Sequence, residues 1–534
     1  MRAAAIFLVV SLAAIAAAWW WLGRPIAMPP SPLQAGAKLD CVSYTPFRRG
    51  QTPLDENIVA SPAEIDADFK LLASVTDCVR TYAVDEGLDQ VPRIAKAHGL
   101  KVVLGLWIGR DPAKNALQIE RGIALANAYH DTVRLLVVGN ETLLRGEISP
   151  ASLGAILQTV RSRVAVPVTY ADVWEFWQQN AALAKDIDVI TIHILPYWEN
   201  EPVAAADAAA HVAAIYGRMK EEFPGKPIMI GETGWPSQGR MRAGARPSPA
   251  NEARVLGDTV AWARRAHVAV NYIEAFDQPW KRVLEGTAGG FWGLFDAGHE
   301  APKFDWGKPV SDHPHWPLEA IGGCLLALAA FAAAALGRRT ASLPPRRWAA
   351  VAAIAVVGGV PLGLAVEYWL FGARNAGEDF EAAIAIGVAV ALPVAAAAAV
   401  ARQDGPAHFS RLLGGAPALR RLSWWLALLA ALLTVEAMAY ALGLVFDPRY
   451  RGFPASTLAG GTFALLMVVL PDWRVRGGAA ERCAAAVLAV AAVAIVVVEG
   501  WPINTEAVAY AVTILILAGT LAGAPVGRGR RATG

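Results

Sequence analysis

Long apolar runs in the second half of this 534-residue chain restrict what it can fold into. A helix needs about 20 mostly apolar residues to cross the hydrocarbon core of a bilayer. Runs near this length recur after Trp316, namely Leu318–Leu336, Trp348–Phe371, Ala382–Val400, Trp424–Val445, Thr457–Leu470, Ala484–Val498 and Ala507–Leu521. We therefore predict an all-α transmembrane domain of about seven helices over residues 317–523.

A further apolar run opens the chain, from Ala3 to Leu22, and ends in three consecutive tryptophans. Tryptophan is enriched at the headgroup level of membranes. Residues 1–22 are thus a transmembrane anchor or a signal peptide, and we favour the anchor because no Ala-x-Ala cleavage site follows closely. Residues 23–38 are rich in proline and predict a stiff, extended linker.

Arginine in the loops between the apolar runs alternates between two sides. One side holds Arg338, Arg339, Arg346, Arg347, Arg402, Arg411, Arg420, Arg421, Arg474, Arg476, Arg482, Arg528, Arg530 and Arg531, and the other holds only Arg374, Arg449 and Arg451. Arg-rich loops are cytoplasmic by the positive-inside rule. The pattern predicts a multi-pass protein of the bacterial inner membrane, with a basic cytoplasmic tail at residues 524–534 and a periplasmic domain between the first two spans. A formal charge of +2 with no basic face gives no reason to expect nucleic acid as a partner.

Residues 39–312 carry most of the charged residues and alternate between two patterns. Apolar segments typical of strands lie at Leu39–Tyr44, Cys78–Ala83, Lys101–Trp107, Leu135–Glu141, Val166–Asp172, Asp188–Ile194, Pro227–Glu232 and Val270–Phe276. Helical patterns lie between them, several of them opened by Ser-Pro or Asp-Pro. Eight alternations predict an α/β fold, the TIM (β/α)8 barrel, whose active site lies at the carboxyl ends of the strands.

Two of these predicted strands end in a carboxylate. The fourth finishes Gly139-Asn140-Glu141 and the seventh finishes Gly231-Glu232, so both glutamates should project into the same mouth of the barrel. Glycoside cleavage needs two opposed carboxylates, one to protonate the leaving oxygen and one to attack the anomeric carbon or activate water. A solvated loop carboxylate is the alternative for either glutamate taken alone.

These segments resemble glycoside hydrolase family 17, the β-1,3-glucanase and glucan transglycosylase family, over roughly Asp40 to Trp306, and are most similar to its bacterial membrane-bound members. The motifs are Ser43–Phe47, Arg80–Tyr82, Gly139–Glu141, His193–Trp198, Gly231–Ser237 and Glu274–Lys281. The resemblance implies that Glu141 is the acid/base and Glu232 the nucleophile of a retaining reaction. It also implies that Asn140 contacts the sugar 2-hydroxyl.

A sugar groove combines flat aromatic faces with hydrogen-bonding groups, because sugar rings have apolar faces and polar rims. Residues of both kinds fall at the predicted strand ends. Those predicted to bind substrate, besides Asn140, are Tyr44, Arg80, Tyr82, Trp107, Tyr170, Asp172, Tyr197, Trp235, Asp277 and Trp280. Packing inside the barrel is the alternative for about half of the aromatic residues.

Cysteine and histidine are few in this domain. Cys41 and Cys78 open neighbouring strands in an oxidising compartment, which leaves a disulfide and two buried thiols equally open. His193 has no second histidine or cysteine at ligand spacing, so we assign it a structural hydrogen bond and expect neither metal nor cofactor.

The acceptor of the cleaved glycosyl unit is not determined by the two glutamates. A membrane-tethered periplasmic enzyme suits glucan synthesis and remodelling in the cell envelope, so we favour transfer to a glucan acceptor, by elongation or β-1,6 branching, over β-1,3-glucan hydrolysis. The expected partners are a β-glucan, the lipid bilayer and a glucan synthase in the same membrane. A sugar transporter with a sugar-binding domain is the third interpretation, supported only by the apolar runs.

Overall fold

The computed structural model describes residues 2–55, 57–299, 301–337, 343–413, 421–472, 477–500 and 502–523, except the side chains of residues 411, 413 and 472. The basic tail at 524–534 and the loop residues Arg338, Arg339, Arg420, Arg474 and Arg476 lie outside the described residues. The chain divides into two compact units. One is Ile26–Val310, and the other combines Met1–Pro25 with Ser311–Gly534.

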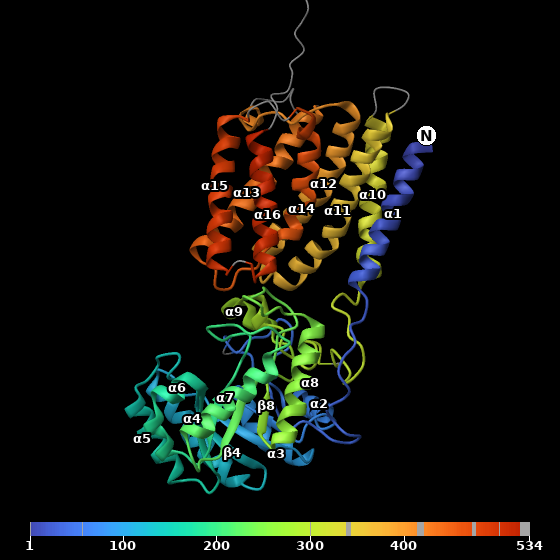
Figure 1. Ribbon diagram of the computed structural model, residues 1–534. Coiled ribbons are helices and arrows are strands. Elements are labelled where there is room, and N and C mark those ends of the chain that lie inside the picture. Colours follow the sequence, from blue (N-terminus) through green and yellow to red (C-terminus); the bar gives the residue numbers. More distant parts are fainter. Residues whose placement is uncertain are drawn as a thin grey trace, which may run out of the picture. The chain divides into compact units, whose positions relative to one another are not determined.

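The unit Ile26–Val310 is a closed barrel of eight parallel strands in chain order, which confirms the predicted TIM barrel (Figure 1). The strands are β1 (Cys41–Ser43), β2 (Cys78–Arg80), β3 (Lys101–Leu106), β4 (Val133–Asn140), β5 (Val168–Val173), β6 (Ile190–His193), β7 (Ile228–Thr233) and β8 (Ala269–Tyr272). β8 also pairs with β1, through Cys41 opposite Asn271, so the barrel has no open edge.

Helices follow the strands and form the outer layer of the barrel (Figure 1). They are α2 (Pro62–Leu72), α3 (Val91–Ala97), α4 (Pro112–Ala128), α5 (Pro150–Arg161), α6 (Trp174–Gln179), α7 (Ala208–Glu222) and α8 (Pro249–Ala266), with 3-10 turns at Leu88–Gln90 and Ala181–Asp186. A 3-10 turn at Pro279–Lys281 and the short helix α9 (Arg282–Gly289) follow β8. The Ser-Pro and Asp-Pro signals mark real helix starts. Ser61, Asp111, Ser149 and Ser248 each accept a hydrogen bond from a backbone N–H in the first helical turn.

Alternation along the strands separates two layers of the core. Val102, Leu104, Leu136 and Val138 pack outward in the large core that the strands share with the helices. Their neighbours Val103, Leu135 and Val137 pack instead with Cys41, Cys78, Ala171 and Met229 in a separate inner cluster. Residues two positions apart on a strand share a face, so Ser43 and Arg80 continue the inner layer above the two cysteines.

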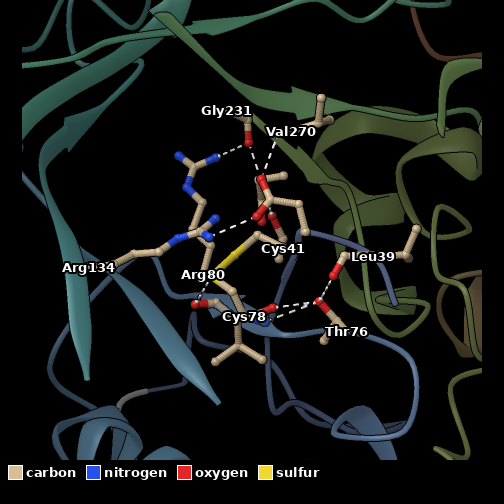
Figure 2. Close-up of a disulfide and its surroundings, with 12 residues drawn as sticks. Leu39, Cys41, Thr76, Cys78, Arg80, Arg134, Gly231 and Val270 are labelled. Atoms are coloured by element: carbon tan, nitrogen blue, oxygen red, sulfur yellow. Dashed lines mark hydrogen bonds and ion pairs between the residues drawn. A yellow bond between two sulfur atoms is a disulfide. The ribbon is translucent and has the colours of Figure 1, made fainter. Parts of the chain in front are cut away.

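A disulfide joins Cys41 to Cys78 within this inner layer, linking β1 to β2 with a Cα separation of 4.3 Å. Figure 2 shows the bridge beside Arg80 and Thr76. The Thr76 hydroxyl lies 2.9 Å from the carbonyl of Cys78 and 3.2 Å from that of Leu39. Of the two states that the sequence left open, the structure has the bridged one.

The second unit is helical. Its helices are α1 (Arg2–Leu22), α10 (Trp316–Gly337), α11 (Pro345–Gly372), α12 (Ala376–Arg402), α13 (Leu422–Phe446), α14 (Ala455–Val469), α15 (Ala479–Val498) and α16 (Thr505–Ala522). Among the described residues, seven helices are long and apolar enough to cross a membrane, and α14 is a shorter apolar helix. All seven apolar runs predicted after Trp316 therefore form helices, but one of them has only 15 residues.

The N-terminal helix α1 packs within this helical unit. Ile15 and Trp19 are fully buried and share a core with residues of α10 and α11. Gly363 of α11 lies so close to Trp19 that a Cβ there would stand 2.3 Å from the indole ring. Tight helix contacts through small residues are typical of membrane bundles.

Removing the disulfide should lower the stability of the barrel. Cys41→Ala combined with Cys78→Ala is expected to cost about 2–4 kcal/mol, because the bridge closes a long loop in the unfolded chain. Thermal unfolding followed by tryptophan fluorescence, with and without reductant, measures the loss. A Cys324→Ser, Cys483→Ser variant is the matched control, since it should keep the wild-type response to reductant. Equal unfolding temperatures for bridged and unbridged barrels would contradict this expectation.

Candidate active site

The glutamates at the ends of β4 and β7 meet in the mouth of the barrel. One carboxylate oxygen of Glu141, one of Glu232 and a ring nitrogen of His193 all lie within 4.8 Å of one another. Each strand has a register shift at its carboxylate. On β4 it lies between Val137 and Asn140, just before Glu141, and on β7 it lies between Ile230 and Thr233, an interval that includes Glu232. Such irregularities re-aim the side chains that follow them.

Backbone conformation also sets the position of Glu141. Gly139 has φ of 87° and Glu141 has φ of 52°, both in the left-handed region, which side chains other than glycine rarely adopt. The N–H of Glu141 donates to the carbonyl of Ala171 on β5 at 2.8 Å. A non-glycine residue held in this conformation indicates local strain, which tends to accumulate at functional sites.

Glu232 is buried and accepts two strong hydrogen bonds. Nη1 of Arg80 lies 3.0 Å from its Oε1, and the hydroxyl of Tyr82 lies 2.9 Å from the same oxygen. Hydrogen bonds from a cation and from a hydroxyl stabilise the ionised form of a carboxylate. Both donors converge on one carboxylate oxygen of Glu232.

The same guanidinium orients Asn140. Nη2 of Arg80 donates to Oδ1 of Asn140 at 2.5 Å, and Nη1 also donates to the carbonyl of Gly231 at 2.7 Å. The Arg80 side chain is only 1% exposed, so these contacts are shielded from water. β2, β4 and β7 are thereby tied together at the level of the two glutamates.

Glu141 keeps a quarter of its side chain exposed and pairs with His193. Nδ1 of His193 lies 3.0 Å from Oε1 of Glu141, and its Nε2 lies 3.6 Å from Oε1 of Glu232. Burial raises the pKa of Glu141, but the hydrogen bond and charge of His193, together with Arg145 and Arg80, outweigh burial and lower it. From the sequence, we predicted only a structural hydrogen bond for His193. Its place at the end of β6, opposite Glu232, was the available signal.

Asp172 and Tyr170 do not line an open groove. Their side chains bond each other and the backbone of the loop after Glu141. Asp172 is fully buried and accepts hydrogen bonds from the Tyr170 hydroxyl and from the N–H of Val173. The Tyr170 hydroxyl accepts in turn from the N–H of Leu143 at 2.9 Å. Burial raises the pKa of Asp172 to about 6, and the charge of Glu141 adds to this.

Several residues predicted to bind sugar are buried and bonded elsewhere. Tyr44, Tyr197 and Trp235 are at most 1% exposed, and they donate to Asp68 and to the carbonyls of Arg240 and Arg246, respectively. Asp277 is paired with Lys303 at 2.9 Å. These four residues, like Tyr170 and Asp172, were expected to line a sugar groove. In the structure they are buried and bonded to other protein groups. Tyr44 and Tyr170 share the outward parity of Val42 and Val168, and so face the helices.

Three aromatic residues remain accessible around the two carboxylates. Trp107 is 41% exposed, and Cζ of the Arg145 guanidinium lies over its ring, 4.1 Å from the centroid of the indole. Tyr82 and Trp280 are partly exposed. They are the aromatic platforms, among the residues predicted to bind sugar, that a ring could reach in this structure.

Glu274, Lys281 and Glu285 form a second charged group near the site. None of the three was among the site residues predicted from the sequence. Nζ of Lys281 lies 2.9 Å from both carboxylate oxygens of Glu274, and burial raises the pKa of Glu274 to about 7. Burial likewise raises the pKa of Glu285 to about 7, and the charges of Glu141 and Glu232 add to it. The sequence signal for Glu274 and Lys281 was the motif Glu274–Lys281 that follows the last strand, and Glu285 lies outside this motif.

The barrel is similar to known glycoside hydrolases. Residues 41–293 match the family described as "BtgE/BtgC glycoside hydrolase domain". The "Probable beta-glucosidase btgE" of Aspergillus fumigatus is 27% identical over 262 residues, covering 48% of this chain and 45% of that protein. The "Glucan 1,3-beta-glucosidase" of Arthroderma benhamiae is 26% identical over 260 residues, covering 46% of this chain and 84% of that protein.

Among solved structures, the glycoside hydrolase family 17 β-1,3-glucanosyltransferase from Rhizomucor miehei is 26% identical. The match has a TM-score of 0.44 and covers 50% of this chain and 97% of that one. The chain spans about half the length of the Aspergillus relative. Both curated relatives are fungal, so they do not support the expected bacterial type.

The barrel therefore resembles a glycoside hydrolase domain over residues 41–293. The predicted enzyme class, glycosidase or transglycosylase, is confirmed by the family match and by the curated relatives. What the whole chain acts on, and the roles of individual residues, are proposals taken up below.

Gly139→Ala should impair glycosidase activity more than a similar change nearby. A Cβ at Gly139 would stand 2.8 Å from Oγ1 of Thr142 in a left-handed conformation, which would displace Glu141. We expect kcat/KM to fall by about tenfold to a hundredfold. Gly146→Ala is the control, because Gly146 also has positive φ but no atom within 4 Å of the added Cβ. Equal losses in both variants would show that backbone strain alone, without displacement of Glu141, explains the effect.

Proposed function

We propose that this protein is a retaining β-glucan-active enzyme, in which Glu232 is the nucleophile and Glu141 the acid/base. The observation that carries the proposal is the separation of the two carboxylates, whose nearest oxygens lie within 4.8 Å. Carboxyl groups of retaining enzymes are about 5–5.5 Å apart, and those of inverting enzymes about 6.5–9.5 Å apart to admit a water. The spacing supports attack by the protein itself.

The environments of the two glutamates support this division of roles. Arg80 and Tyr82 donate to Glu232 and keep it charged for attack on the anomeric carbon. Glu141 is the more exposed of the two and has one hydrogen-bonded partner, His193, that can exchange a proton with it. Asn140, fixed by Arg80, presents its amide nitrogen as a donor for the sugar 2-hydroxyl.

The proposed substrate is a β-1,3-glucan. Its support is the name of the Arthroderma relative, a glucan 1,3-β-glucosidase, together with the family match over the whole barrel. Trp107, Tyr82 and Trp280 offer aromatic faces for successive glucose rings. Hydrolysis is the second candidate, because the curated relatives are named as glucosidases.

We propose transfer to a glucan acceptor, by elongation or β-1,6 branching, as the preferred outcome. This preference rests on the membrane domain. Helices α1, α10–α13, α15 and α16 could span a bilayer. With the arginine asymmetry of the loops, they support a multi-pass protein of the bacterial inner membrane with a periplasmic barrel, close to a glucan synthase in the same membrane.

Substitution of each glutamate, followed by rescue with azide, tests the assignment. Glu141→Ala should lower kcat/KM on laminari-oligosaccharides by about 10²–10⁴-fold, and Glu232→Ala by at least as much. Azide should attack the glycosyl-enzyme of Glu141→Ala to give a β-glycosyl azide. In Glu232→Ala it replaces the nucleophile and should give the α-glycosyl azide from a donor with a good leaving group.

Glu120→Gln is the control for this experiment, because Glu120 pairs with Arg163 on the exposed outer surface of the barrel. It should keep wild-type activity. Full activity in either active-site variant, or the opposite azide anomers, would remove the assigned roles.

Product analysis separates transfer from hydrolysis. The full chain in detergent, incubated with a laminari-oligosaccharide labelled at its reducing end, should give products longer than the substrate. Mass and linkage of the products identify elongation or branching. Shorter products alone, with ¹⁸O from water at the new anomeric centre, would establish hydrolysis and overturn the preference for transfer.

A further inference from the structure

His193 occupies an unusual place between the two carboxylates. Its side chain is fully buried at the end of β6, and it faces Glu141 through Nδ1 and Glu232 through Nε2. Nε2 is buried and has no hydrogen-bond partner among the described residues. An imidazolium carries an N–H on each nitrogen, so the doubly protonated ring would direct one donor to each glutamate.

Charge balance in the buried cluster favours the same state. Glu141 and Glu232 contribute two negative charges when both are ionised, and Arg80 contributes one positive charge. Buried charges are costly unless they are compensated. One further proton, held on His193, makes the cluster of four side chains neutral.

The other titratable groups that face the cluster are paired or have pKa values shifted towards the neutral form. Arg145 pairs with Glu147, and Lys281 pairs with Glu274. Burial raises the pKa of Asp172 to about 6 and that of Glu285 to about 7, which shifts both towards their neutral forms. The environment of Tyr82 raises the pKa of its hydroxyl, so this partly exposed side chain acts on Glu232 as a neutral donor.

A general acid must carry a proton when the sugar is in place. In the free enzyme, however, His193, Arg145 and Arg80 lower the pKa of Glu141 and favour its ionised form. A titratable group in contact with Glu141 can supply the proton that catalysis needs. His193 is the titratable group in direct hydrogen-bond contact with Glu141.

We propose that His193 is a positioning residue that holds the catalytic proton beside Glu141 in the free enzyme and returns it when the glucan binds. This inference rests on the proposed function. Glucan binding displaces water from Glu141 and disfavours its charge, so the proton moves from Nδ1 of His193 to Oε1 of Glu141. The imidazole becomes neutral and keeps its Nε2–H towards Glu232.

The proton is then conserved through both chemical steps. Glu141 gives it to the glycosidic oxygen as the C1–O bond breaks and a carboxylate oxygen of Glu232 bonds to C1. In the second step, an acceptor hydroxyl gives its proton to Glu141 while its oxygen bonds to C1 and the bond to Glu232 breaks. After the product leaves, the proton returns to His193 and Glu141 is ionised again.

His193→Asn and His193→Gln test the proposal, because an amide can still donate a hydrogen bond to Glu141 but cannot store a proton. In the full chain, the alkaline limb of the pH profile of kcat/KM on laminari-oligosaccharides should move to lower pH by about one unit or more. The rate at neutral pH should fall by about tenfold or more. Two variants are used so that at least one folded protein is available.

A donor that needs no acid supplies the second readout. 2,4-Dinitrophenyl β-laminaribioside has a leaving group that departs unprotonated, so its kcat/KM should fall less than about threefold in the folded variants. His299→Asn is the matched control: His299 is also buried, pairs with Asp68 at 2.9 Å and lies in the same barrel. It should leave the pH profile unchanged.

An unmoved alkaline limb in a folded His193 variant, or equal losses on both donors, would overturn the proposal and leave His193 a purely structural role. This failure differs from failure of the proposed function. The latter would appear as activity retained in Glu141→Ala or Glu232→Ala, whatever the behaviour of the His193 variants.

Discussion

One buried guanidinium connects the parts of this active site. Arg80 reaches from β2 to the carbonyl of Gly231, the carboxylate of Glu232 and the amide of Asn140. A buried cation is stable only when its charge is balanced and its donors are satisfied. Glu232 supplies the balance, and both groups are buried where β2, β4 and β7 come together. The closed barrel therefore brings the groups of the site together.

Strand parity explains which residues reach the mouth of that barrel. Arg80 and Tyr82 share the inward parity of Cys78, and Trp107 shares that of Val103, so all three point into the barrel. Tyr44 and Tyr170 have the opposite parity and pack under the helices. Counting residues along the strands could have made this distinction. The prediction from the sequence treated every aromatic residue at a strand end alike, so it did not separate inward-facing residues from outward-facing ones.

The two glutamates at the mouth of the barrel are chemically identical but have different electrostatic surroundings. Glu232 receives donors from a cation and a phenol, while Glu141 shares a contact with an imidazole and keeps some exposure to solvent. Environments that treat two carboxylates differently are a general means of assigning one to attack and the other to proton transfer. Here the difference comes from β2 and β6, which carry Arg80 and His193, and not from the strands that carry the glutamates.

The sequence by itself determined the barrel, the apolar helices and the pair of strand-end glutamates. The alternation of strand and helix patterns, the length of the apolar runs and the glycines just before the two glutamates are all local features of the sequence. It could not place Glu232 by parity, since the register shift on β7 turns that side chain inward. It also could not show that His193 lies between the two carboxylates, or that Asp277 is satisfied by Lys303. These pairings join residues far apart in the chain, and only the closed barrel brings such residues within hydrogen-bond distance.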